Sequence, residues 1–238
     1  MNCMGSTFHG FSWEALDFLR QLRRNNRRLW FEKHKTIYEE KVRQPMVKLV
    51  QALNLDLRGF APEMVTDPKR AIYRIYRDVR FSPDKSPYKT HIAALFTPHN
   101  IPKHAGGGFY FHLSAEELLV AGGVYMPGPK ELLAIRKIIA QDERPLRRII
   151  ASRRFKECFG TLQGGQLSRV PKGFPSNHPA ADLLRFKQFL VSAAHPAEYA
   201  LDNELFQRLT TCFRVMTPLV RFLNKPLIES LSRDVFEL

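Results

Sequence analysis

The sequence has no long apolar run. No window approaches the about 18 consecutive apolar residues that a membrane-spanning helix needs. Cysteine is scarce: Cys3, Cys158 and Cys212 have neither the even count of a disulfide framework nor the spacing of a zinc site. There is also no G-x-S-x-G, H-E-x-x-H or C-x-x-C motif. These absences exclude a membrane protein with helical spans, a disulfide-stapled scaffold and the enzyme classes that those three motifs mark.

The first ten residues have neither the basic start nor the apolar core of a secretory signal. Together with the few cysteines, this predicts a cytoplasmic protein that does not associate with membranes. No motif for a cofactor is found, so we expect none. The sequence says nothing about protein partners.

Acidic residues are outnumbered by basic ones. There are 37 Lys and Arg against 23 Asp and Glu, which gives a net charge of +14. The excess is uneven: +4 lies within residues 70–91, +6 within residues 141–188, and residues 189–238 contribute −1. The first of these segments also contains four aromatic residues, Tyr73, Tyr76, Phe81 and Tyr88. Basic and aromatic residues interleaved in this way are typical of a surface that binds anions or nucleic acid.

Hydrophobic periodicity predicts helices at both ends of the chain and strands between them. A period of two indicates strands over residues 71–79, 91–97, 109–113, 118–124 and 186–192, with a hairpin turn at 114–117. Residues 160–179, rich in Gly and Pro, predict a long loop, and residues 204–223 a helix. We therefore predict an α+β fold with a mostly antiparallel sheet of about four to five strands, centred on residues 70–125 and flanked by N-terminal and C-terminal helices. We expect one domain over residues 8–230, with frayed termini at 1–7 and 231–238.

The basic segment predicts a strand, a turn and a returning segment. Alternation in the strand defines two faces: Tyr73, Ile75 and Val79 on one, and Arg74, Tyr76, Asp78 and Arg80 on the other. Arg77 falls on the apolar side, so either a bulge re-aims it or it is buried with a partner. The composition around Pro83 is that of a β-turn, so the chain should double back.

The turn should bring two lysines near the arginines, and planar guanidinium groups suit phosphate or carboxylate. The candidate anion-binding residues are Arg74, Arg77, Arg80, Lys85 and Lys89, and the candidate supporting residues are Asp78, Asp84, Tyr76, Tyr88, His91 and Lys172. An aspartate between arginines keeps a low pKa, which makes it a poor general base near neutral pH. We expect Asp78 to orient the arginines.

Three hypotheses follow. The leading one is binding of a phosphate-bearing or other anionic ligand, either a nucleotide or nucleic acid. The second is an enzyme that acts on a phosphorylated or carboxylated substrate in the same pocket, with His91 or Tyr88 handling a proton. The third is a structural ion-pair network with no ligand. The sequence identifies no catalytic residue, so whether the protein is an enzyme stays open.

Histidines and glycines elsewhere carry weaker signals. His91, His99, His104 and His112 have no close helical pair and no nearby carboxylate in sequence, so we expect no metal site. Two consecutive glycines at 122 and 123, inside a predicted strand, indicate a bulge or the close approach of another backbone or a ligand, and of these we expect tight packing.

The central motif carries a resemblance to a known family. Arg74-x-x-Arg77-Asp78-x-Arg80-Phe81, followed by Asp84-Lys85-x-Pro87-Tyr88-Lys89, resembles the signature of a conserved hypothetical family, domain-of-unknown-function family 2461. Asn25-Asn26-x-x-x-Trp30-Phe31 and Pro171-Lys172-Gly173-Phe174 fit in order. The resemblance covers almost the whole chain, roughly residues 11–223. That family has no established activity, so the resemblance implies one conserved domain and transfers no catalytic residue.

Overall fold

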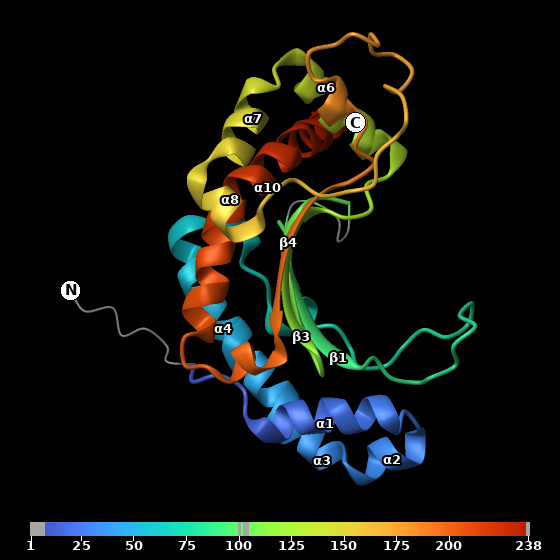
Figure 1. The fold of residues 1–238 in the computed structure, drawn as a ribbon, viewed down its shortest axis with the longest axis vertical. Helices are drawn as coiled ribbons and strands as arrows, with labels where there is room; N and C mark the ends of the chain where they lie inside the picture. Colours follow the sequence, from blue (N-terminus) through green and yellow to red (C-terminus); the bar gives the residue numbers. More distant parts are fainter. Residues whose placement is uncertain (1–7, 100, 102–104, 237–238) are drawn as a thin grey trace, which may run out of the picture. The chain divides into compact units, whose positions relative to one another are not determined.

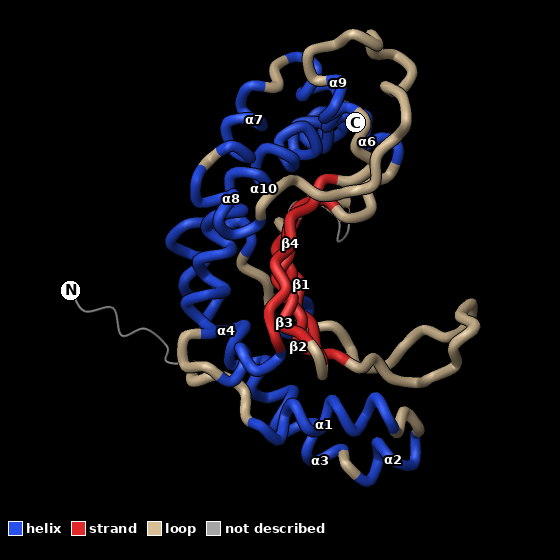
Figure 2. Tube along the Cα trace, viewed as in Figure 1, coloured by secondary structure: helices blue, strands red, loops and turns tan. Residues whose placement is uncertain are grey.

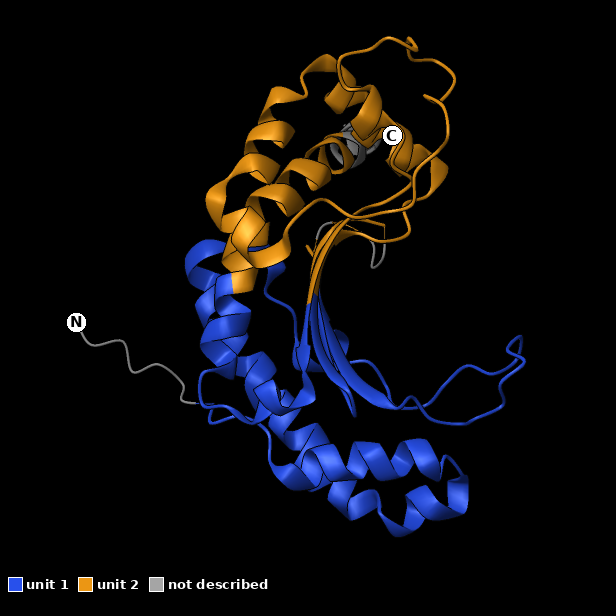
Figure 3. Cartoon of the chain, viewed as in Figure 1, with its two compact units in different colours: residues 1–96, 110–120, 194–211 blue, residues 97–109, 121–193, 212–238 orange. Residues whose placement is uncertain are grey.

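The computed structural model describes residues 8–99, 101 and 105–236, with side chains described as far as Glu229. These residues form two compact units (Figure 3). Unit 1 contains the described residues within 1–96, 110–120 and 194–211, and unit 2 contains those within 97–109, 121–193 and 212–238. The expectation of a single domain over residues 8–230 stays a prediction. Within the described residues, no helix has the length and apolar character needed to cross a membrane.

Unit 1 begins with helices, as the periodicity predicts (Figure 1). Leu16, Leu19 and Leu22 recur every three residues, so all three are buried on one face of α1. The backbone N–H of Asn25 donates to the Gln21 carbonyl and closes that helix. The helical elements of unit 1 are α1 (Trp13–Arg24), α2 (Arg28–Lys33), α3 (Lys35–Ile37), a π-helical turn η1 (Tyr38–Arg43), α4 (Gln44–Phe60), η2 (Pro62–Met64), α5 (Pro68–Ala71) and η3 (Ala197–Leu201).

Four strands form one antiparallel sheet, in the order β1-β2-β3-β4 (Figure 2). The strands are β1 (His91–Phe96), β2 (Gly108–Ser114), β3 (Glu117–Val124) and β4 (Phe189–Pro196). The predicted α+β class and the hairpin between β2 and β3 are confirmed. In β2, Phe109, Phe111 and Leu113 are buried, whereas Tyr110 and His112 on the other face are half-buried. The sheet therefore has one core face and one more open face.

The strand predicted over residues 71–79 is wrong. Helix α5 ends at Ala71, and the following chain pairs only through the isolated bridges Ile72–Ala94 and Tyr76–Tyr88. The two bridges are out of register with each other, because three residues lie between Ile72 and Tyr76 but five lie between Tyr88 and Ala94, so no continuous ladder forms. Asn26 bonds the N–H and the carbonyl of Tyr88, and the backbone bonds across the bridge are made by its neighbours instead. We call residues 72–90 the arm. It doubles back as predicted, and Figures 1 and 2 show it as a long loop that extends away from the start of β1.

Unit 2 contains α6 (Pro129–Gln141), α7 (Arg144–Ala151), α8 (Arg153–Phe159), α9 (Ala181–Leu184) and most of α10 (Leu205–Phe236). Pro129 opens α6, as its fixed φ favours. The long loop predicted before residue 180 is confirmed, since no named helix or strand lies between α8 and α9. The final helix is longer than predicted, because it continues past Pro226.

At Gly123, β3 lies close against the backbone of β4. Its φ is +111°, and a Cβ atom there would lie 2.1 Å from the carbonyl oxygen of Phe189. At Gly122, a Cβ atom would lie 2.2 Å from Sδ of Met216 in α10. The tight packing predicted from the two glycines is confirmed.

Candidate functional site

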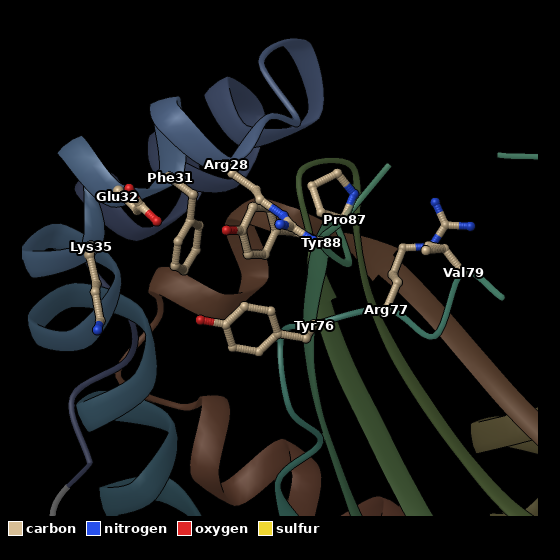
Figure 4. A pocket seen from close by; sticks show the side chains of 9 residues that line it. All are labelled: Arg28, Phe31, Glu32, Lys35, Tyr76, Arg77, Val79, Pro87 and Tyr88. Atoms are coloured by element: carbon tan, nitrogen blue, oxygen red, sulfur yellow. The ribbon is translucent and has the colours of Figure 1, made fainter. Parts of the chain in front are cut away.

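A pocket of about 350 Å³ lies in unit 1 between α2, α3 and the arm (Figure 4). Its lining combines aromatic rings with charged side chains from segments far apart in the sequence. The lining residues are Arg28, Phe31, Glu32, Lys35, Tyr76, Arg77, Val79, Pro87 and Tyr88. We call this the arm pocket. Its volume is at the lower end of the range of about 300–1,000 Å³ found for small-molecule sites.

Stacked aromatic rings form one wall of the arm pocket. The rings of Phe31 and Tyr88 are parallel, with centroids 4.1 Å apart, and Tyr76 lies 5.4 Å from Tyr88. Phe31 is held from behind by Phe18 and Tyr38. Phe31 and Tyr88 are buried, but Tyr76 is 52% exposed and presents its ring to the pocket.

The wall is positioned by one amide side chain. Asn26, in the turn between α1 and α2, donates to the Tyr88 carbonyl at 2.9 Å and accepts from the Tyr88 N–H at 3.1 Å. These two bonds join segments 62 residues apart. The arm is thereby fixed to the N-terminal helices at the pocket.

The charges of the arm pocket are mostly positive. Arg28 and Lys35 are exposed, and within the described part of the chain neither side chain has a hydrogen bond or an ion pair. Glu32 is the acidic residue of the lining, and Arg77 lies at the arm side of the pocket. The pocket therefore offers two uncommitted cations beside an aromatic wall.

Two of the predicted anion-binding arginines are already paired. Arg77, only 26% exposed, forms an ion pair with Asp84, and a second bond reaches Ser82 Oγ at 3.4 Å. Arg77 therefore has a partner, as one of the two alternatives predicts, but it is half-buried rather than buried. Arg80 forms a bidentate ion pair with Asp78: Nε donates to Oδ1 at 3.0 Å and Nη2 donates to Oδ2 at 2.7 Å.

The aspartates of the arm are held in their charged form, as expected. Hydrogen bonds from Arg80 lower the pKa of Asp78 to about 2. Hydrogen bonds from Ser86 and Arg77 hold the pKa of Asp84 well below its ordinary value. Neither carboxylate can act as a general base near neutral pH.

The two lysines of the motif bond to the backbone of the arm. Lys85 Nζ donates to the Val79 carbonyl and Lys89 Nζ to the Arg74 carbonyl, each at 3.0 Å. The side chain of Arg74 is exposed and, among the described residues, makes no hydrogen bond or ion pair. The five predicted cations therefore do not converge on one pocket, and Arg77 is the member that lines the arm pocket.

His91 lies on the open face of the sheet, beside His112 of β2, with the ring centroids 5.0 Å apart. Burial, with smaller contributions from His112 and Lys89, lowers the pKa of His91 to about 4. His91 is therefore neutral at pH 7. His112 is hydrogen-bonded to Tyr110 at 3.1 Å and lies 3.3 Å from Glu117.

Comparison with known proteins identifies the family. A protein family described as "Conserved hypothetical protein (DUF2461)" matches residues 14–222. The chain belongs to this family. No curated protein and no solved structure gives a significant match. The match to DUF2461 covers every residue of the arm and of the arm pocket, and the family's description assigns them no activity.

Other predicted residues lie away from the arm pocket. Lys172 is exposed in unit 2, on the loop between α8 and α9, and its role stays a prediction. His104 is outside the described residues. Among the residues that are described, no group of three or more His, Cys, Asp or Glu side chains is arranged to hold a metal ion.

Reasoning from the sequence missed Arg28 and Lys35 as binding candidates. They lie 46 and 39 residues before Arg74, the start of the motif, and nothing in the local pattern distinguishes them from neighbouring exposed cations. The signal that points to them is Asn25-Asn26 ahead of Trp30-Phe31. Because Asn26 bonds the backbone of Tyr88, the helix that follows Asn26 is placed against the arm.

Proposed function

We propose that unit 1 binds a ligand with a phosphate group next to a planar ring, a nucleotide or a nucleotide unit of nucleic acid, in the arm pocket. The observation that carries this is the pairing of two uncommitted cations, Arg28 and Lys35, with the exposed ring of Tyr76. A guanidinium and an ammonium group bind phosphate oxygens, while aromatic rings stack on bases regardless of their identity.

The proposal changes the roles of the motif residues. Arg77 and Arg80 are neutralised by Asp84 and Asp78, so their first role is to shape the arm. Arg77 still lines the arm pocket and adds a third cationic group at its edge. Arg74, on the exposed side of the arm, is the candidate for a further phosphate contact along a longer nucleic acid.

Isothermal titration with adenosine monophosphate, adenosine and inorganic phosphate tests this function. We expect the nucleotide to bind more tightly than either part. Lys35→Gln and Arg28→Gln should each weaken binding about tenfold or more, because a hydrogen bond to a charged group contributes about 1.5–3 kcal/mol. Tyr76→Ala should cost a similar factor, since stacking contributes about 1–3 kcal/mol per base.

The matched controls are Lys33→Gln and Arg24→Gln. Arg24 is an exposed cation at the end of α1, and Lys33 is an exposed cation at the end of α2. Neither residue lines the arm pocket. These variants should bind as the wild type does. If the nucleotide does not bind, or if the control variants lose as much affinity as Lys35→Gln, the proposed function is wrong.

The ion pairs of the arm favour a second, structural function for the motif. If the arginines only stabilise the arm, Arg77→Ala should lower the melting temperature while ligands leave it unchanged. Differential scanning fluorimetry of this variant and the wild type, with and without the nucleotide, separates the two functions. A nucleotide-dependent rise in melting temperature that Lys35→Gln removes supports binding.

A further inference from the structure

A hydrogen-bonded chain of three ionisable side chains lies on the open face of the sheet. Tyr110 and His112 are two residues apart on β2, so their side chains share that face, and Glu117 is at the start of β3. The Tyr110 hydroxyl lies 3.1 Å from Nδ1 of His112, and Nε2 of His112 lies 3.3 Å from Oε1 of Glu117. Both nitrogens of the imidazole are therefore engaged.

The partners assign the protons in this chain. A carboxylate only accepts, so Nε2 of His112 carries the hydrogen that points to Glu117. Nδ1 is then the acceptor, and the Tyr110 hydroxyl donates to it. Burial lowers the pKa of His112, while Glu117 acts in the opposite direction. His112 is therefore neutral at pH 7, and the nearby carboxylate stabilises the imidazolium that would form on accepting a proton.

The surroundings of Tyr110 indicate the kind of substrate. The ring of Tyr73 lies 6.4 Å from that of Tyr110, and Lys89 Nζ lies 5.0 Å from the Tyr73 ring. His91, with its ring 5.0 Å from His112, is a further nitrogen-bearing group on the same face. Lys89, which also donates to the Arg74 carbonyl, is therefore separated from Tyr110 by the Tyr73 ring. A positive charge near a hydroxyl group that has a proton acceptor suits an anionic electrophile such as a phosphate ester.

We propose that Tyr110, His112 and Glu117 form a catalytic relay in which the Tyr110 oxygen attacks a phosphodiester. The new bond joins that oxygen to phosphorus, and the bond between phosphorus and the leaving alcohol's oxygen breaks. The Tyr110 proton passes to Nδ1 of His112, and Glu117 pairs with the imidazolium. The leaving oxygen departs as an anion and takes a proton from solvent. Water then attacks phosphorus and gives one proton to solvent, the bond between phosphorus and the Tyr110 oxygen breaks, and His112 returns its proton to that oxygen.

The relay does not depend on the arm pocket. It places the reaction at residues other than His91 and Tyr88, which the sequence suggested for proton handling. Tyr110 is the nucleophile and His112 the general base and acid. Glu117 is a positioning residue, because it acts through His112.

The test uses bis(p-nitrophenyl) phosphate as the probe. The wild type should release about one equivalent of p-nitrophenolate in a rapid phase, and peptide mass spectrometry should locate the p-nitrophenyl phosphoryl group on Tyr110. Tyr110→Phe should abolish the release. His112→Gln should slow it about 100-fold, which is the low end of the effect of general base catalysis. Tyr125→Phe is the matched control, since Tyr125 is 66% exposed and lies outside the relay.

The pH profile distinguishes chemistry from a structural role. The rate of release in the wild type should fall as pH drops through the titration of His112, and His112→Gln should lose this dependence. The phosphoryl group on Tyr110 is sought in the wild-type protein, so its presence or absence decides the question even if a variant unfolds. The relay is wrong if the wild type releases nothing, if the adduct is on another residue, or if Tyr110→Phe reacts as the wild type does.

Discussion

Ionisable side chains on the arm and on the open face of the sheet are close in sequence, but the arm favours the charged form and the sheet face favours the neutral form. On the arm, hydrogen bonds from Arg80 stabilise the charged form of Asp78. On the sheet face, burial stabilises the neutral form of His91. Ionised aspartates and a neutral histidine are therefore found within residues 78–91.

The neutral state of His91 predicts how stability depends on pH. Its folded pKa is about 4, below the ordinary value of 6.5, so the unfolded chain takes up a proton first as pH falls. The wild type should lose stability between pH 6.5 and 5. At about 1.4 kcal/mol per pH unit, reduced by the partial exposure of the ring, we expect a loss of about 1 kcal/mol that His91→Gln does not show.

Urea unfolding of both proteins at the two pH values measures this difference. His9→Gln, a change at an exposed histidine, should keep the wild-type dependence on pH. Equal slopes for the wild type and His91→Gln would contradict the prediction.

At the scale of elements, hydrophobic periodicity predicted the four strands that pair in the sheet. It failed for the arm, where it predicted a strand that does not form. Burial does alternate there, with Ile75 buried between exposed Arg74 and Tyr76, which is why the pattern suggested a strand. The ladder is broken by the change of register between the two bridges, and the returning segment is held by Asn26, which is 62 residues away from Tyr88 in the chain. A local pattern holds no information on such a partner. The same limit kept Arg28 and Lys35 out of the predicted site.

The junction of β3 and β4 gives the prediction for this scale. Gly123→Ala should destabilise unit 2 by about 3 kcal/mol, because it combines a strained φ with a Cβ atom placed against a backbone carbonyl. Gly59→Ala is the matched control. It lies in α4 with no atom within 4 Å of the added Cβ, so it should stabilise the protein by up to about 1 kcal/mol. Chemical denaturation of both variants measures these changes, and a neutral Gly123→Ala would disprove the packing account.

At the scale of the whole molecule, a charge of +14 favours binding of any polyanion, so total charge alone does not identify a site. The sequence places +4 in residues 70–91 and +6 in residues 141–188. The structure shows which basic side chains in these segments are paired with a carboxylate. Arg147 of α7, for example, bonds both oxygens of Asp182. How many basic side chains can contact a polyanion must therefore be measured from binding.

Salt dependence provides that measurement. If duplex DNA binds through the arm, the logarithm of the association constant should fall with the logarithm of salt concentration, with a slope of about −0.9 for each phosphate neutralised. Arg74→Gln should reduce the slope by about one such contact, whereas Arg154→Gln on α8 should leave it unchanged. Fluorescence anisotropy between about 50 and 200 mM salt measures both slopes. No binding at the lowest salt, or equal changes in the two variants, would argue against contact through the arm.

The isolated bridges on either side of the sheet have a consequence for self-association. β1 and β4 are the outermost strands, and an outermost strand with unpaired backbone groups is a template for pairing with another molecule. The arm bridges β1 at Ile72–Ala94, and the long loop of unit 2 bridges β4 at Gln163–Leu190. Neither covering segment is itself a regular strand, so neither presents a new continuous edge. The irregularity that defeated the strand prediction thus protects the sheet from growing by addition of a second chain.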